Sequence, residues 1–324
     1  MLNNIVQNHL DFIVFICALL AERFLPLVSW YHPNHILSAI FSAISQRIYK
    51  KTDTKQYHYL AASMASTLIL STVLIIVVLL LQFAFYPELL SGLILYLCLE
   101  NSSLNKKAIR IARLVKKNQK STARELLKPL VAREVIALSS PGIIKAIIES
   151  VILRTARHYF VVIFIFLVLG PVAALAYRLI TLIQQAWRSD IAPNSSFLMP
   201  LKLVLFIVEY IPIRLLALTI ASLKASKKSM HYIKHYIKHY GRHFYQTNTG
   251  WLLSVCSASL GVQLGGPAIY NTQRFNKMRV GVERLPNADD IPQLLNTLNQ
   301  TRFFWLLIII SVEIIKAVLV FKFA

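Results

Sequence analysis

One long uncharged apolar run limits what this chain can fold into more than any other feature. The segment 60–85 contains the sequence STVLIIVVLLLQFAF. A helix needs roughly 20 mostly apolar residues to cross the hydrocarbon core of a bilayer. Hydrophobic residues make up 56% of the chain and charged residues only 15%, whereas charged residues make up about a quarter of soluble domains. The sequence therefore predicts a multi-pass membrane protein and excludes an ordinary soluble fold.

Other apolar segments suggest how many times the chain crosses. The segments 89–99 and 251–270 are short or rich in Gly and Ser, so each could cross the membrane or re-enter it. The three cysteines all lie in apolar stretches and support neither a disulfide framework nor a Cys-based zinc site. We expect an all-α fold, a polytopic membrane helical bundle with about five or six spans plus cytoplasmic helical insertions, as a single domain over 1–324. The main candidate spans are 10–28, 60–85, 159–183, 201–223 and 303–323.

The charge balance is strongly basic. The 35 Lys and Arg residues exceed the 14 Asp and Glu residues, which gives a formal net charge of +21. Because basic loops stay in the cytoplasm, we expect an outside N-terminus, a cytoplasmic basic segment at 47–55, cytoplasmic basic insertions at 100–157 and 224–250, and an external loop at 188–199. Anionic lipid headgroups attract such loops, so the lipid bilayer is the expected partner. No nucleic acid is expected, because no folded soluble module with interleaved aromatic residues is present.

Two helix starts are predicted in the first basic insertion. Ser121 can cap a helix that carries Glu125 in its first turn, where the helix dipole favours an acid. A second helix is expected after Ser139-Ser140-Pro141, because Pro suits the first helical position. Amphipathic helices lying on the membrane would produce the same pattern.

The run HYIKHYIKHY at 231–240 repeats with a period of four. On a helix it places His231, His235 and His239 on one face, where two His at i and i+4 could chelate a metal. No carboxylate or Cys lies nearby in the sequence to complete such a site. A solvated interfacial helix is therefore the favoured interpretation.

Two pairs of ionisable residues stand out inside apolar segments, where such residues are candidates for function. Glu209 precedes Arg214 by five residues, and Glu313 precedes Lys316 by three. Each pair could instead be a buried ion pair that holds helices in register, which is the preferred interpretation for Glu313 and Lys316. For Glu209 and Arg214 the two interpretations stay open.

The segment 248–270 is rich in glycine within an apolar stretch. Gly261, Gly265, Gly266 and Pro267 indicate that the backbone turns sharply or is approached closely there. The segment matches neither a P-loop nor a dinucleotide fingerprint. Glycine-rich backbone beside the basic residues of 274–279 could cradle a phosphate.

This segment also resembles the C-terminal signature of the CobD/CbiB family. The resemblance rests on Leu-Gly-Val-Gln-Leu-Gly-Gly-Pro at 260–267, on Asn-Thr-Gly-Trp before it, and on Lys277, Gly281 and Asp-Asp-Ile after it. Similar stretches occur in order along nearly the whole chain. They include Arg133-Glu134, Glu149-Ser150-Val151, Tyr177-Arg178 and the stretch 210–215.

The resemblance implies a ligase of cobalamin biosynthesis in the bacterial inner (cell) membrane. Such a protein resembles adenosylcobinamide(-phosphate) synthase, which joins aminopropanol or aminopropanol phosphate to adenosylcobyric acid by ATP-dependent amide ligation. ATP and Mg²⁺ would be required, a corrinoid would be the substrate, and other corrinoid-assembly membrane enzymes are candidate partners. Glu134 and Glu149 would hold a metal or orient the amine, with no metal ligand set assigned. The expected substrate- and phosphate-binding residues are Arg133, Arg178, Arg214, Asn248, Gln263, Gly265, Gly266 and Lys277.

Several acidic positions of the family are replaced in this chain. The segment 153–157 reads Leu-Arg-Thr-Ala-Arg where the family carries a Glu-Asn-Thr-Val-Asp stretch, so the assignment as an enzyme depends on the resemblance. The chain is also similar in places to AmpE, a related membrane protein tied to β-lactamase induction, for example at 21–24 and 157–160. A non-enzymatic AmpE-like membrane regulator or scaffold is therefore the alternative. A transporter fits less well, because no inverted repeat is seen.

Overall fold

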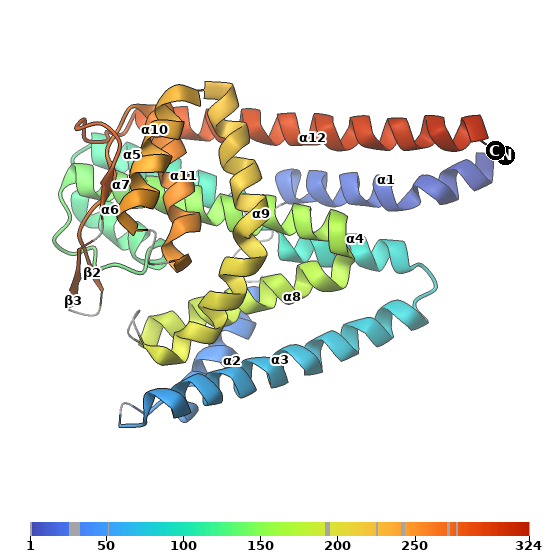
Figure 1. The fold of residues 1–324 in the computed structure, drawn as a ribbon, viewed down its shortest axis with the longest axis horizontal. Coiled ribbons are helices and arrows are strands. Elements are labelled where there is room, and N and C mark those ends of the chain that lie inside the picture. Colours follow the sequence, from blue (N-terminus) through green and yellow to red (C-terminus); the bar gives the residue numbers. More distant parts are fainter. Residues whose placement is uncertain are drawn as a thin grey trace.

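The protein is described by a computed structural model that covers residues 2–25, 33–50, 52–100, 102–191, 195–224, 226–240, 244–270, 273–276 and 278–323. The described chain is almost entirely helical (Figure 1). In order, its elements are α1 (Leu2–Phe24), α2 (Pro33–Ile48), α3 (Lys55–Phe83), α4 (Pro87–Cys98), α5 (Ser102–Lys116), α6 (Lys120–Leu127), the 3-10 turn η1 (Lys128–Leu130), α7 (Ser140–Thr155), the π-helix η2 (Ala156–Val161), α8 (Val162–Asp190), the 3-10 turn η3 (Ser196–Leu198), α9 (Met199–Lys224), α10 (Ser226–Tyr240), α11 (Phe244–Leu260), β1 (Leu264–Gly265), β2 (Ala268–Tyr270), β3 (Gln273–Phe275), β4 (Arg279–Val280) and α12 (Asp290–Phe323).

The apolar run predicted as a span forms α3. The hydroxyl of Thr54 accepts a hydrogen bond from the N–H of Tyr57 and so caps the first turn. After α3 the chain turns at 84–86, and α4 packs back against α1. Close contact at that interface depends on Gly92, because a Cβ there would lie 2.2 Å from Cγ1 of Val14. The segment 89–99 is thus a short separate helix.

Helix α8 is two helical arms joined by a reversal at Gly170. Gly170 has φ 85° and ψ −178°, which is not helical, and Pro171 follows it. The Nε2 atoms of His158 and Gln185 lie 2.9 Å apart. In a straight helix these residues would be separated by about 40 Å, so the chain must double back between them. The expectation of one span over 159–183 is therefore wrong, since the apolar stretch forms a hairpin.

This reversal also corrects the expected position of the loop at 188–199. The second arm of α8 returns that loop to the end of the molecule where α3 begins, and η3 packs against α3 there. Lys55 and Ser195 line one pocket, so they cannot lie on opposite sides of a bilayer. The prediction of an external loop at 188–199 with a cytoplasmic segment at 47–55 is therefore wrong.

Three helical stretches in the described residues are long and apolar enough to cross a membrane, and they cover 55–83, 140–188 and 196–224. The second of these is the hairpin. The C-terminal half of α12 also carries exposed apolar side chains such as Ile315 and Val318, and Figure 1 shows α12 and α1 extending toward the same end. Helix α9 runs across the direction of α1 and α12 (Figure 1).

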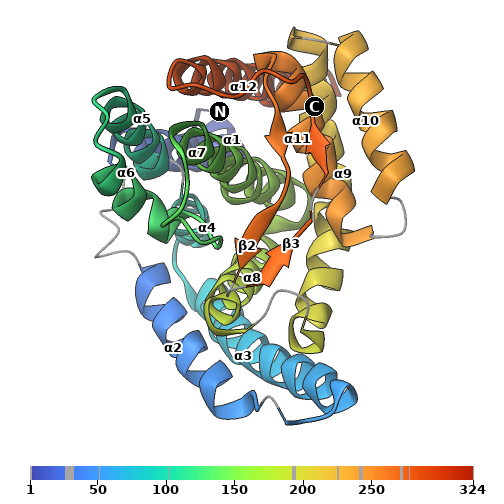
Figure 2. The same cartoon turned by 90° about the vertical axis from the view of Figure 1, so that its left-hand side faces the viewer.

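The segment 251–270 is not one helix, as its glycines suggested. Helix α11 ends at Leu260, and Gly261 follows with φ 62°. The chain then forms two small antiparallel pairs, β1 with β4 and β2 with β3. Figure 2 shows β2 and β3 on the face turned to the viewer, in front of α8. The all-α expectation is correct for the bundle and misses these strands.

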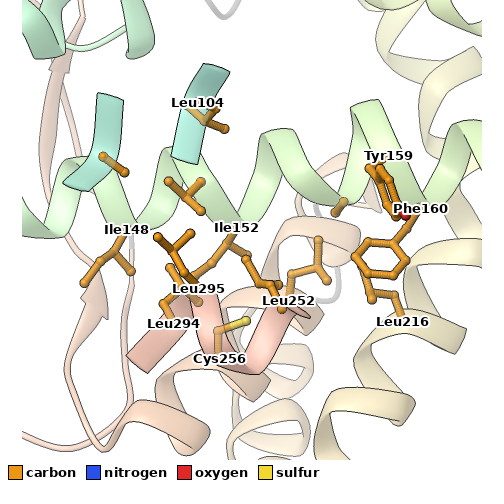
Figure 3. Packing of buried hydrophobic residues seen from close by; sticks show 14 of the residues in the cluster. Leu104, Ile148, Ile152, Tyr159, Phe160, Leu216, Leu252, Cys256, Leu294 and Leu295 are labelled. Carbon is orange, nitrogen blue, oxygen red and sulfur yellow. The ribbon is translucent and has the colours of Figure 1, made fainter. Parts of the chain in front are cut away.

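Helix α7 lies at the centre of the packed core. Figure 3 shows Ile148 and Ile152 of α7 packed near Leu252 and Cys256 of α11 and Leu294 of α12. The predicted start of α7 is confirmed, because the Ser139 hydroxyl accepts a hydrogen bond from the N–H of Gly142. The predicted cap at Ser121 is wrong, since α6 begins at Lys120 and has no side-chain cap.

The His-Lys repeat forms α10, as predicted. Ile233 and Tyr236 are buried against the neighbouring helices, while His231 and His235 are exposed. The side chain of His239 lies outside the described residues. The repeat thus produces an amphipathic helix that packs on α11.

Candidate active site

The carboxylate of Glu149 joins three segments that are far apart in the sequence. Its Oε2 accepts a hydrogen bond of 2.8 Å from Nη2 of Arg133, and its Oε1 accepts one of 2.7 Å from the backbone N–H of Gly265. Both charged side chains are largely buried, with 11% and 17% of their surface exposed. Charge-assisted hydrogen bonds of this kind are stronger than neutral ones. Glu149 therefore ties the 131–139 loop and the glycine-rich segment to α7.

Glycine is required at positions 265 and 266. Gly265 has φ 72° and Gly266 has φ 95°, which side chains with a Cβ rarely adopt. A Cβ on Gly265 would also lie 2.3 Å from the carbonyl oxygen of Met278. That same carbonyl accepts a hydrogen bond of 2.9 Å from the N–H of Gly266. The sequence-based expectation of a close backbone approach is confirmed here.

Three cations surround this glycine pair. A Cβ on Gly266 would lie 3.2 Å from Cγ of Arg279 and 3.4 Å from Nζ of Lys145. Lys145 interacts electrostatically with Arg133, Glu149 and Arg279, and we call these four side chains the Glu149 cluster. Lys145 was not identified from the sequence, although it lies one helical turn before Glu149.

Glu134 contributes a backbone hydrogen bond that helps to position the segments around the Glu149 cluster. Its N–H donates a hydrogen bond of 2.9 Å to the carbonyl of Ile269 on β2, which ties the β2–β3 hairpin to the 131–139 loop. The Glu134 side chain is exposed. A carboxylate at the edge of the cluster is accessible to a substrate.

A second group of polar side chains surrounds the carboxylate of Glu100. Two of its members, Arg154 and His158, follow Glu149 by five and nine residues on α7 and η2. Nη2 of Arg178, on the returning arm of α8, pairs with the carboxylate of Glu100. Nδ1 of His158 lies 3.8 Å from the same carboxylate. Nη2 of Arg154 donates to the carbonyl of Pro129 and interacts electrostatically with Glu100 and Arg178. Arg178 therefore lies in this separate group.

The π-helix η2 positions the next ion pair. Such wide turns are rare and often occur at functional sites. Nε of Arg157 lies 2.9 Å from Oε1 of Glu209, and the hydroxyl of Tyr177 donates to the same oxygen at 3.1 Å. Glu209 is only 1% exposed. An ion pair between Glu209 and Arg214 was one of the two interpretations left open, and it does not form, because Arg157 pairs with Glu209 instead.

Arg214 and Asn248 join α9 to α11. Nη1 of Arg214 donates to Oδ1 of Asn248 at 3.0 Å, and Nδ2 of Asn248 donates to the carbonyl of Phe206. The guanidinium of Arg214 also lies 3.3 Å from the ring centre of Tyr210. All of these partners belong to the protein itself, so in this structure Arg214 and Asn248 connect α9 to α11.

The remaining predicted residues have backbone roles or lie outside the description. The N–H of Gln263 donates to the carbonyl of Arg284 at 2.8 Å, and its side chain is half-buried. Lys277 lies outside the described residues. The structure therefore brings together Arg133, Glu149, Gly265 and Gly266, adds Lys145 and Arg279, and places Arg178, Arg214 and Asn248 in other contacts.

The described residues form no cluster of three or more His, Cys, Asp or Glu side chains that could enclose a metal ion. Glu149, Glu100 and Glu209 each pair with an arginine. Mg²⁺ is commonly held by one or two carboxylates together with water and substrate phosphates. The cations of the Glu149 cluster suit phosphate groups better than a bare metal ion.

The fold and this site define a class, which is a helical membrane protein with a basic, glycine-lined site at the end of its bundle. A family profile described as CobD/Cbib protein matches residues 15–188. The chain belongs to this family.

Curated relatives agree with this assignment. The chain is 27% identical to the Cobalamin biosynthesis protein CobD of Chromobacterium violaceum over 65% of its own length and 67% of the relative's. It is 26% identical to the protein of the same name from Stutzerimonas stutzeri, over 67% of this chain and 70% of that one. A shorter match, 30% identical over 93 residues, is found in Dehalococcoides mccartyi. No solved structure matches the chain.

Proposed function

We propose that the protein acts in cobalamin biosynthesis as an ATP-dependent amide ligase. It would join aminopropanol or aminopropanol phosphate to the carboxylate of adenosylcobyric acid, giving adenosylcobinamide or its phosphate. The observation that carries this proposal is the Glu149 cluster, in which family-signature segments converge on a glycine pair flanked by three cations. The curated relatives carry the name Cobalamin biosynthesis protein CobD, which favours this function over an AmpE-like regulator.

Each reactant in this reaction suits a basic site. ATP, a substrate carboxylate and an aminopropanol phosphate are all anionic, and Arg and Lys stabilise charge on a transferring phosphoryl group. We assign Arg133, Lys145 and Arg279 to phosphate binding. Glu149 positions Arg133 and the glycine pair, and the exposed carboxylate of Glu134 takes a proton from the attacking amine.

The reaction balances without a further reactant. The corrinoid carboxylate is activated by phosphoryl transfer from ATP, which leaves ADP. The amine nitrogen then forms a bond to the activated carbonyl carbon, phosphate leaves with the electrons of the broken C–O bond, and one amine proton is lost to a base. Mg²⁺, if required, would enter with ATP, since the described residues form no cage for it.

We also propose a placement in the bacterial inner membrane. Helices α1, α3, α4, the two arms formed by α7 and α8, and α12 would give six crossings, which lies within the expected five or six. The basic segments, together with the loop at 188–199, would then lie on the cytoplasmic side. Helix α9 would lie along that surface.

Complementation tests the proposed activity. A bacterial strain lacking its own family member is supplied with adenosylcobyric acid under conditions in which growth requires cobalamin. We expect the chain to restore growth, Glu149→Gln to abolish it, and the matched surface variant Lys117→Gln to retain it. Adenosylcobinamide or its phosphate should appear in membranes given ATP and the amine. Absence of growth and product, with the protein present in the membrane, would contradict the proposal.

A further inference from the structure

A pocket separate from the Glu149 cluster lies where α3 and α9 begin. It has a volume of about 720 Å³ and is lined by Lys55, Gln56, Tyr59, Leu60, Ser195, Ser196, Met199 and Lys202. The first turn of α3 supplies one wall, and η3 with the first turn of α9 supplies the other. Lys55 and Lys202 are the charged residues among those that line it.

Several features place this pocket at the level of a membrane surface. Helix α3, a proposed crossing, begins at the pocket, and so does α9, which is proposed to lie along the membrane surface. Tyr and Trp concentrate at membrane–water interfaces, and an aromatic group lies beside the pocket. Tyr57 and Tyr59 are exposed on the first turns of α3. The ring of Phe197 packs on those of Tyr49 and Trp187, with ring centres 5.5 and 4.8 Å away.

Two apolar stripes lead away from the pocket. On α3, Leu60, Met64 and Leu68 follow one another at helical spacing and are 58%, 65% and 70% exposed. On α9, a second stripe continues from Met199 with a period of four. Its members are Leu203, Ile207 and Ile211, all exposed. Residues four apart share a helix face, and the two helices diverge from this point (Figure 1). Exposed apolar surface on both helices therefore begins next to the two lysines.

We propose that this pocket binds an anionic phospholipid. The phosphate of the head group pairs with the ammonium groups of Lys55 and Lys202, and the acyl chains run along the stripe of α3 and pack against the exposed apolar side chains of α9. Basic pockets between membrane helices bind such head groups, because a phosphodiester is matched in charge and the adjoining hydrocarbon is matched by the apolar side chains. A zwitterionic lipid carries its own cation and lacks this complementarity.

Native mass spectrometry of the purified full chain tests the proposal. The protein in detergent is titrated with phosphatidylglycerol or phosphatidylcholine, and the lipid-bound fraction is measured. We expect phosphatidylglycerol to bind more tightly, and Lys55→Gln with Lys202→Gln to weaken it by about 30-fold, to the level of phosphatidylcholine. The double variant Lys55→Arg with Lys202→Arg should retain binding. The matched control Lys117→Gln with Lys120→Gln removes two exposed lysines elsewhere and should change nothing.

Three outcomes would overturn the proposal. The first is equal binding of phosphatidylglycerol by the wild type and the Lys55/Lys202 glutamine variant. The second is an equal loss in the Lys117/Lys120 control, which would show that net charge alone attracts the lipid. The third is complete displacement of phosphatidylglycerol by soluble glycerol phosphate, which would identify a site for a free phosphate. These measurements do not depend on ligase activity.

Discussion

The backbone N–H of Gly265 donates a hydrogen bond of 2.7 Å to Oε1 of Glu149, although 116 positions separate the two residues. Because Arg133 holds the other oxygen of the same carboxylate, one side chain fixes both a loop and a tight turn. A change at Glu149 therefore alters the geometry of the site before it alters any chemistry.

Replacing Glu149 should separate the effect of its charge, which pairs with Arg133, from the effect of its hydrogen bond to Gly265. Glu149→Gln keeps an oxygen that can accept the Gly265 hydrogen bond but loses the charge that pairs with Arg133. Losing a hydrogen bond to a charged group costs about 1–3 kcal/mol, so we expect a modest loss of thermal stability together with loss of product formation. Glu149→Ala should lose more stability than Glu149→Gln. Equal melting temperatures for all three proteins would show that the clamp does not stabilise the fold.

Alanine at the glycines offers a matched comparison. Gly265→Ala introduces strain at positive φ and a Cβ 2.3 Å from the Met278 carbonyl, whereas a Cβ on Gly261, also at positive φ, meets nothing within 4 Å. Strain of this kind costs about 1–3 kcal/mol. We expect Gly265→Ala to lower the melting temperature clearly more than Gly261→Ala does. A larger effect at Gly261 would argue against the described turn.

The reversal at Gly170 can be tested by labelling single cysteines in a cysteine-free variant. Gln56→Cys and Ser196→Cys should react with a membrane-impermeant maleimide from the same side of the membrane, because both residues line one pocket. Ala84→Cys, in the turn between α3 and α4, should react from the opposite side. Labelling of positions 56 and 196 from opposite sides would contradict the hairpin and support a single span over 159–183, as the sequence suggested.

Removing only one member of the ion pair between Arg157 and Glu209 should strongly destabilise the protein. Glu209 is 1% exposed, and Arg157 is its charged partner. Removing one member of a buried pair typically costs about 3–5 kcal/mol, whereas replacing both with apolar residues can be nearly neutral. We expect Glu209→Leu to destabilise the protein strongly and the double variant Arg157→Met with Glu209→Leu to recover much of the loss. A double variant no more stable than Glu209→Leu would show that the two side chains are not coupled.

Thiol chemistry should test the burial of Cys256. Burial raises the pKa of Cys256 to about 12, so the unreactive thiol form persists at pH 8 and the thiolate appears only as the pH approaches that value. A small membrane-permeant maleimide should leave Cys256 unmodified in the folded protein at pH 8 and modify it after denaturation. Modification of Cys256 at pH 8 without unfolding would contradict the packing of α11.

Local signals in the sequence were sufficient for many elements of the fold. The Ser139-Ser140-Pro141 start of α7 and the apolar run of α3 depend on residues adjacent in the chain, so both could be predicted. The glycine pair at 265 and 266 indicated a close backbone approach for the same reason. The family resemblance singled out Glu149 as a site residue, but its hydrogen bond with Gly265 was not predicted.

Other features depend on contacts between distant segments. A Gly-Pro step in a long apolar run can signal a kink or a reversal, and only the packing of α8 on α2 and α3 decides between them. Glu209 and Arg214 are five residues apart, a spacing that does not place two side chains on the same helix face. Arg157, which lies 52 residues away, takes the pairing because the hairpin brings it to α9.

The π-helix η2 also affects how this chain should be aligned with its relatives. Its hydrogen bonds reach five residues back instead of four, so the turn at 156–161 accommodates one residue more than a regular α-helix. A relative with an ordinary turn there would carry one residue fewer while keeping α7 and α8 in the same positions. A one-residue gap at this point of an alignment therefore marks the loss or gain of the wide turn that presents Arg157 and His158, and the helix continues through it.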